Sequence, residues 1–294
     1  MSGFWLRVGT QAVASWCPAS DLDVTKCRLG RCLGEFEVVN PWERRTAPIC
    51  HVLREDAGLA EAVAPADRER AIEECIAATV RLPRGRWSGE HTDLMRDGIG
   101  LLVLQGLLIR RVGIRGGSGA ELLGDGDLLR PWQGEDAQPL AHTTGWRVLQ
   151  PTRLAVLDLR AAQRLARYPE LTGLLVARAL ERSRNLVMNM AIVYQARVDV
   201  RLHMLLWHLA YRWGYVRTDG TVLPLRLTHA VLAELVAARR PTVTAALSQL
   251  AGRGLVHTID DGWLLAGEPP GELLELQKLA APPREAGSDR RSPA

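Results

Sequence analysis

The 294-residue sequence lacks several features that mark common classes of protein. It contains no run of eighteen apolar residues, so we predict no membrane-spanning helix. The first residues include one arginine but neither a long apolar core nor a clear cleavage site, so a secretory signal is not expected. The five cysteines are an odd number at irregular intervals. These absences favour a cytoplasmic location.

Motifs of catalytic and metal sites are also missing. There is no G-x-S-x-G, no P-loop, no H-E-x-x-H, and no G-x-G-x-x-G after a predicted strand. Cys17, Cys27, Cys32 and Cys50 are separated by nine, four and seventeen residues, without the close C-x-x-C pair that is typical of zinc and iron–sulfur sites. We therefore predict no enzyme, no metal site and no cofactor. For residues 1–50 an unstructured extension is favoured, with a metal or cluster site as the alternative.

Lysine is nearly absent as well. Lys26 and Lys278 are the lysines among 37 basic residues, a bias that we attribute to a GC-rich coding genome rather than to nucleic-acid binding. Charged residues at 24% and apolar residues at 47% are ordinary for a soluble protein, and the net charge is +4. The length favours two domains. Local clusters of arginine are therefore more informative than the total.

The clearest pattern lies between Leu227 and Gly252, where two short helical patterns flank a joint of a few residues. Thr228 is placed as the N-cap of the first helix, before His229. Pro241 stands where a first helical turn tolerates proline. The apolar positions are Val231, Leu232, Leu235 and Val236 in the first helix, and Val243, Ala246, Leu247 and Leu250 in the second. Small side chains in the joint allow a steep helix crossing, as a helix-turn-helix requires.

The outward face of the second helix carries side chains that donate to phosphates and reach base edges in a major groove. They are Arg239, Arg240, Thr242, Thr244, Ser248 and Gln249. Between Arg226 and His257 there are four arginines and one carboxylate, Glu234. We take Arg240 as a base or phosphate contact, with Arg239, Thr242, Thr244 and Ser248 as further DNA-binding candidates. Thr228, His229 and the turn at 260–262 are candidates for contacts to the DNA backbone.

Two strand patterns follow, Val256–Ile259 and Trp263–Leu265, around the turn signal Asp260-Asp261-Gly262. Together with the two helices they predict a winged helix-turn-helix. The two aspartates argue against a tight phosphate clamp at the tip of this hairpin. The alternative is a helical hairpin whose small ribbon serves packing alone.

In the first half of the chain, the spacing of the apolar residues changes along the sequence. From His51 to Val80 we expect two helices, the second with Ile72, Cys75, Ile76 and Val80 on its apolar face and Cys75 as a buried small hydrophobe. From there to Asp158, glycines punctuate short apolar runs, a pattern typical of a sandwich or barrel of short strands. Trp132 and Trp146 are favoured as core residues, and stacking on a planar effector is the alternative.

A long helical pattern runs from Leu159 to Ala196, with an interruption at Pro169. After Pro169 about 27 residues can form one helix that is apolar on more than one face. One face must cover the strands, and the other needs a partner. Dimerisation is favoured over burial within one protomer.

The segments LTHAVLAELV, ARRPTV and ALSQLAGRGLV resemble the Crp/Fnr superfamily of bacterial transcription regulators. The run QGLLIRRVGIRGGSGAELLGDGDLLRPW is similar to the β-roll of the cyclic-nucleotide-binding-type domain in that superfamily. Members commonly open the recognition helix with Arg-Glu-Thr-Val and a second Arg two residues later. Arg240, Thr242 and Val243 match, whereas Pro241 replaces the Glu and Ala245 the second Arg. The resemblance therefore supports the module without implying a particular operator.

The Gly-Glu and Arg cassette of cyclic-nucleotide binders is not recognisable at 126–132, so a different small effector, or none, is expected. The predicted fold is α+β: a jelly-roll-like β-roll sensor domain, a long dimerisation helix and a winged helix-turn-helix. The expected segments are an extension (1–50), the β-roll (51–158), the dimerisation helix (159–197), the winged domain (198–268) and a largely disordered tail (269–294).

These features predict a sequence-specific transcription regulator that binds an operator in double-stranded DNA as a homodimer. The helix at about Arg240–Leu250 would enter the major groove. The resemblance implies RNA polymerase as a further partner. The alternative is a ligand-sensing or protein-interaction module whose winged helix does not bind DNA. The operator sequence, the effector, and whether the protein activates or represses do not follow from these residues.

Overall fold

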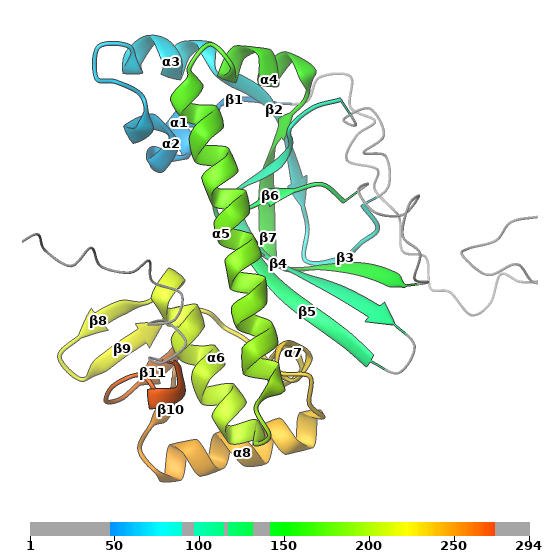
Figure 1. Ribbon diagram of the computed structural model, residues 1–294, viewed down its shortest axis with the longest axis vertical. Coiled ribbons are helices and arrows are strands. Elements are labelled where there is room, and N and C mark those ends of the chain that lie inside the picture. The colour runs from blue at the N-terminus through cyan, green and yellow to red at the C-terminus, as the bar shows by residue number, and fades with distance from the viewer. Residues whose placement is uncertain (1–47, 90–96, 115–116, 132–141, 274–294) are drawn as a thin grey trace, which may run out of the picture. The chain divides into compact units, whose positions relative to one another are not determined.

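The computed structural model describes residues 48–89, 97–114, 117–131 and 142–273 (Figure 1). Its first part is an antiparallel sheet of the order β1-β2-β7-β4-β5, in which β3 also pairs with β7 and β6 with β4. The strands are β1 (Ile49–His51), β2 (Ile76–Leu82), β3 (Gly85–Trp87), β4 (Gly100–Ile114), β5 (Gly117–Gly124), β6 (Leu128–Leu129) and β7 (Thr143–Leu157). Many of their apolar side chains are fully buried, as the pattern of short apolar runs predicts.

The two longest strands, β4 and β7, form the centre of this sheet. They pair from Gly100 opposite Leu157 to Gly113 opposite Thr143, with register shifts in the middle that bend the ladder. At the bend Gly106 has φ +117°, and a Cβ there would lie 2.5 Å from the hydroxyl oxygen of Thr152. Glycine is required at this position because the backbone of the neighbouring strand comes so close.

The helix expected to run on to Val80 ends earlier. The short helices are α1 (Val52–Glu55), α2 (Ala57–Ala62) and α3 (Arg68–Glu74). After Cys75 the chain enters β2, which pairs with β1 on one side and β7 on the other. The prediction of helix over Ile76–Val80 was therefore wrong, because pairing with two distant strands outweighs a local period that fits either structure. Cys75 itself is buried, as predicted.

Two helices follow the sheet, α4 (Leu159–Leu165) and α5 (Pro169–Tyr194). Asp158 caps α4 by accepting a hydrogen bond from the backbone N–H of Ala161 at 2.8 Å. Pro169 stands at the first position of α5, where its missing N–H leaves no helical bond unmade. Figure 1 shows α5 as the longest helix, beside the sheet.

The last part of the described chain contains three helices and a second sheet. The elements are α6 (Val198–Trp213), β8 (Tyr215–Arg217), β9 (Gly220–Leu223), α7 (His229–Leu235), α8 (Arg240–Gly252), β10 (Val256–Ile259) and β11 (Gly262–Leu265). The second sheet has the order β10-β11-β9-β8, so the expected two-stranded wing is extended by the hairpin at 215–223.

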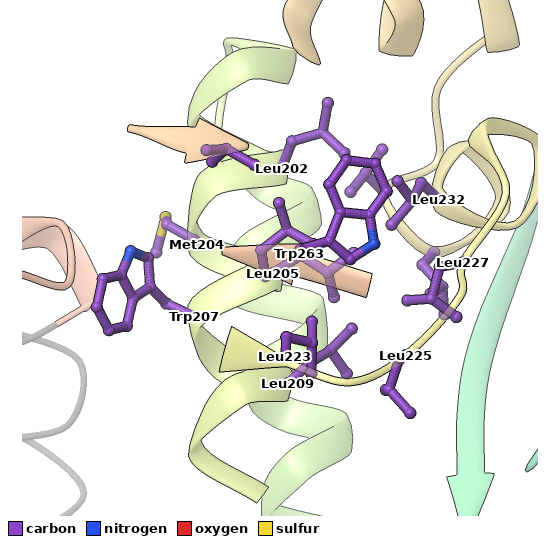
Figure 2. Close-up of a cluster of buried hydrophobic side chains, with 14 of the residues drawn as sticks. Leu202, Met204, Leu205, Trp207, Leu209, Leu223, Leu225, Leu227, Leu232 and Trp263 are labelled. Atoms are coloured by element: carbon purple, nitrogen blue, oxygen red, sulfur yellow. The ribbon is translucent and has the colours of Figure 1, made fainter. Parts of the chain in front are cut away.

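A continuous apolar core joins α6, α7, α8 and the second sheet. Figure 2 shows Trp263 of β11 lying among leucines that come from α6, α7 and the segment between β9 and α7. Trp263 is 5% exposed and Leu232 is fully buried. Because α8 is attached to this core, the outward face of α8 has a fixed orientation relative to the β10–β11 hairpin.

The α+β fold class with an antiparallel sheet domain, a long helix and a helix-turn-helix is confirmed. Cys17, Cys27, Cys32, Trp132 and most of the expected extension and tail lie outside the described residues. Ile49 and Cys50, at the end of the expected extension, belong to β1. Among the described helices, none is long and apolar enough to cross a membrane. Within the described ranges, no group of three or more His, Cys, Asp or Glu could hold a metal ion.

Candidate nucleic-acid interface

Thr228 and His229 open the first helix of the pair. The hydroxyl oxygen of Thr228 accepts a hydrogen bond from the backbone N–H of Val231 at 3.3 Å, so Thr228 is the N-cap of α7, as predicted. His229 is the first residue of α7, and its Nδ1 lies 2.9 Å from the hydroxyl oxygen of Thr244 on α8. This contact brings two of the predicted site residues together, although they are fifteen residues apart in sequence.

The joint between the helices is held by its backbone. Ala237 has φ +49°, a left-handed conformation that non-glycine residues seldom adopt. It reverses the chain after α7, and the N–H of Ala238 then donates to the carbonyl of Ala233 at 2.9 Å. A small side chain at 237 is needed because a β-branched one would be strained in this conformation.

Four apolar residues fix the direction in which α8 faces. They are Val243, Ala246, Leu247 and Leu250, and all four are buried. The predicted DNA-binding residues Arg240, Thr242, Thr244 and Ser248 are exposed on α8, and Arg239 is its N-cap. Thr244 and Ser248 share one side of the helix, whereas Thr242 lies about 90° around from the centre of the outward face. Gln249 is also exposed on α8.

The charge of this surface is positive near the start of α8. In the described part of the chain, neither Arg239 nor Arg240 has a carboxylate partner. The wing differs, because Arg226 donates to Asp261 at 2.6 Å and both side chains are more than two-thirds exposed. This ion pair was not foreseen from the sequence. The positive charge of Arg226 offsets the negative charge of Asp261, one of the two turn aspartates that argue against a phosphate clamp.

The sequence of this region matches a known family model. Over residues 200–265 the chain matches the description "Crp-like helix-turn-helix domain". The resemblance to the Crp/Fnr superfamily inferred from the sequence is thereby confirmed over this domain, and it supports a DNA-binding transcription regulator. The residues that carry the resemblance, from α7 through the wing, lie inside the matched range.

Solved structures extend the comparison beyond the Crp-like domain. A mutant of CooA from Carboxydothermus hydrogenoformans has 16% identity and a TM-score of 0.51, covering 81% of this chain and 97% of its own. A cyclic nucleotide-binding domain containing protein from Listeria monocytogenes EGD-e has 12% identity and a TM-score of 0.53, covering 72% and 97%. Both share the fold of the chain. No curated protein matches its sequence.

Outside the Crp-like domain, arginines line a cavity of about 320 Å³ between α5 and the first sheet. Its arginines are Arg110, Arg130, Arg178 and Arg182. Arg178 donates two hydrogen bonds to Asp56, and Arg182 donates two to Glu121. The guanidinium of Arg110 also lies 3.1 Å from Glu121, so Arg110 and Arg182 share one carboxylate. Guanidinium groups are the side chains that bind anions through paired hydrogen bonds.

Trp146 forms one wall of this cavity. It is 7% exposed, its ring meets that of Trp87 edge-on at 5.5 Å, and the guanidinium of Arg110 lies 5.9 Å from its centre. Burial lowers the pKa of Arg110, and the nearby Arg182 adds to this effect while Glu121 opposes it. None of these four arginines was predicted from the sequence as a site residue. The spacing of Arg178 and Arg182, one helical turn apart on the side of α5 that faces the sheet, was the signal that could have found two of them.

Proposed function

We propose that this protein is a sequence-specific transcription regulator that binds operator DNA as a homodimer, with α8 in the major groove. The observation that carries the proposal is the outward face of α8. It begins with Arg239 and Arg240, which have no carboxylate partner in the described chain, and it belongs to a Crp-like helix-turn-helix domain. A face used for packing against protein would bury apolar side chains, whereas this one exposes hydroxyls, small side chains and guanidiniums.

The dimensions of α8 fit this role. An α-helix with its side chains is about 10–12 Å in diameter, and the major groove of B-DNA is about 12 Å wide. The 13 residues of α8 give a helix roughly 20 Å long. Arg240 at the start of α8 would contact a base or a phosphate. Thr228 and His229, at the start of α7, would contact the DNA backbone, because free N–H groups at a helix N-terminus attract phosphate.

A second copy of the chain is the proposed partner of α5. Seven of its exposed residues lie at a spacing of alternating three and four: Gly173, Val176, Leu180, Ser183, Val187, Met190 and Tyr194. This is the period of a coiled-coil seam, in which two helices bury the same stripe against each other. Val187 is 64% exposed and Met190 is 72% exposed in the single chain. Two α8 helices about 34 Å apart would then contact a two-fold-symmetric operator.

The arginine-lined cavity beside α5 is the proposed site of a small anionic effector. The cavity lies against α5, the helix that also carries the exposed seam. A bound anion would therefore contact the helix through which the two copies pair. An effector can shift DNA binding only through a difference in its affinity for two states of the protein. Titration calorimetry with inorganic phosphate and with cyclic nucleotides would test this part, and binding should weaken in the Arg110→Gln variant.

Selection of bound sequences from a random duplex pool, with the purified full chain, tests the main proposal. We expect enrichment of an inverted repeat whose half-sites are one helical turn apart. The affinity for the selected duplex should fall steeply with salt, because phosphate contacts release counterions. Weak binding with little salt dependence would favour the other candidate, a module whose winged helix contacts protein.

A further inference from the structure

The centre of the outward face of α8 consists of small side chains. Successive helical residues are rotated by about 100°, so the side opposite the buried stripe is occupied by Pro241, Ala245 and Ser248, with Thr244 beside them. All four are exposed. The guanidinium of Arg240 starts from a position about 110° away from this centre. The centre of this face is therefore shaped by methyl and methylene groups, with the exposed Gln249 on the side opposite Thr244, about 70° from the centre.

The hydroxyl group of Thr244 already has two intramolecular partners. Its Oγ1 donates to the carbonyl oxygen of Arg240 at 3.1 Å and lies 2.9 Å from Nδ1 of His229. A hydroxyl has a single hydrogen, so Nδ1 of His229 is the donor when the hydroxyl bonds to Arg240 and the acceptor when the hydroxyl bonds to His229. Both contacts turn the oxygen toward the protein. The part of Thr244 that remains for a DNA partner is its methyl group.

The hydroxyl group of Ser248 also forms a hydrogen bond within the helix. Its Oγ donates to the carbonyl oxygen of Thr244 at 3.1 Å. The hydrogen is used within the helix, and the lone pairs that remain can only accept. The four central residues thus offer a proline ring, two methyl groups and one acceptor, without a free donor.

This set of groups distinguishes base pairs in the major groove. Thymine presents a methyl group there, which alanine and the threonine methyl contact favourably. Adenine and cytosine present amino donors that an acceptor can bind, whereas guanine presents two acceptors, O6 and N7. Guanine opposite this face would lose its hydration without gaining a donor, which is unfavourable.

We propose that α8 selects operators in which thymine methyl groups face Thr244 and Ala245 and the amino group of adenine or cytosine faces Ser248. The inference rests on the proposed DNA binding and adds the source of its sequence preference. Pro241 and Ala245, the two positions at which the chain departs from the Arg-Glu-Thr-Val pattern and its second Arg, both lie on this face. Proline and alanine stand at these positions in place of the Glu and the second Arg of the pattern. The face therefore lacks a carboxylate and a guanidinium and is apolar. The preferred half-site therefore has A·T pairs at the positions that face Thr244 and Ala245.

Replacement of thymine by uracil tests this directly, because it removes the methyl group and leaves base pairing unchanged. Starting from the duplex selected with the full chain, each thymine of the half-site is replaced in turn and affinity is measured by fluorescence anisotropy. We expect about a fourfold loss for each methyl group that meets Thr244 or Ala245. Replacement outside the half-sites should have no effect.

A matched pair of variants assigns the contact to α8. Ala245→Gly should abolish the discrimination between thymine and uracil at one position, because the methyl group on the protein side is gone. Ala251→Gly makes the same change on the same exposed helix but away from the central face, so it should leave the discrimination intact. The thymine-to-uracil ratio is measured within each variant, so a general loss of stability does not alter it.

The outcomes separate this inference from the proposed function. Specific binding with half-sites centred on G·C pairs, or with affinities indifferent to uracil, would overturn the inference and leave DNA binding in place. Failure to bind any duplex, with and without added phosphate or cyclic nucleotide, would overturn the proposed function itself. Loss of affinity on replacing thymine within the half-site, with one of the sensitive positions made indifferent by Ala245→Gly and none by Ala251→Gly, would establish the methyl contact.

Discussion

The guanidinium of Arg182 on α5 donates two hydrogen bonds to the carboxylate of Glu121 on β5, at 2.6 and 2.8 Å. A second guanidinium, that of Arg110, lies 3.1 Å from the same carboxylate. The side chain of Glu121 is 7% exposed. One buried carboxylate therefore joins the long helix to two strands of the sheet, and each guanidinium depends on it for charge compensation.

Glu121→Gln should be strongly destabilising. The amide keeps the shape of the side chain but leaves Arg110 and Arg182 without an opposite charge, and we expect the free energy of unfolding to fall by about 3 kcal/mol. Denaturation by urea, followed by circular dichroism, measures it. The control is Asp219→Asn, which breaks an exposed pair with Arg217 and should cost less than about 1 kcal/mol. Equal losses in the two variants would contradict the role of Glu121.

His208 should make stability depend on pH. Burial, with a smaller contribution from Arg212, lowers the pKa of His208 to about 4. The unfolded chain binds the proton below about pH 6.5, so the stabilising contribution is complete above that pH and is lost as the pH falls from 6.5 toward 4. The loss is on the order of 3 kcal/mol. His208→Gln should flatten this part of the profile, and identical profiles for the variant and the original protein would rule out His208.

The exposed seam of α5 should determine the oligomeric state. Val187→Glu places a carboxylate in the middle of the stripe and should convert a dimer into monomers in sedimentation equilibrium. Val216→Glu is the matched control, because Val216 is 83% exposed on β8 and away from the seam. A dimer that survives the change at 187 would require a different interface. A dimer lost in both variants would point to a nonspecific effect.

Arg240→Ala should weaken specific DNA binding. If Arg240 contacts a base, the loss is about 1–3 kcal/mol, and the preference at one position of the half-site relaxes. If it contacts a phosphate, the salt dependence becomes shallower by about one unit of slope. Arg217→Ala, an arginine paired with Asp219 in the β8–β9 hairpin, should leave affinity unchanged. An unchanged affinity for Arg240→Ala would remove that residue from the interface.

Local signals made the helix-turn-helix predictable from sequence. A cap at Thr228, a proline in the first turn of α8 and an Asp-Gly turn in the wing each act over a few residues, and the structure has all three. The strand that begins at Ile76 was missed because its partner strands are distant in sequence: the paired residues lie 25 to 29 positions earlier in β1 and 70 to 78 positions later in β7. At short range, Ile72, Cys75 and Ile76 fit a helical period equally well.

The contacts of the candidate sites were less predictable. Arg178 pairs with Asp56 and Arg182 with Glu121, across 122 and 61 residues of sequence, and no local pattern specifies such partners. The contact between His229 and Thr244 depends on the crossing of α7 and α8, which is set by the left-handed backbone at Ala237. The sequence predicts which residue types lie on this surface. It does not predict which of their hydroxyl hydrogens are already used in hydrogen bonds within the protein.

Pro241 has a consequence for how firmly the protein would hold its operator. A helix start normally offers several backbone N–H groups at fixed positions, and proline withdraws one of them at the first turn of α8. Anchoring at that end would rest instead on the long, rotatable side chains of Arg239 and Arg240. Such side chains adjust their reach, so the domain would tolerate small differences in groove width among its target sites and would distinguish their promoters mainly by base content.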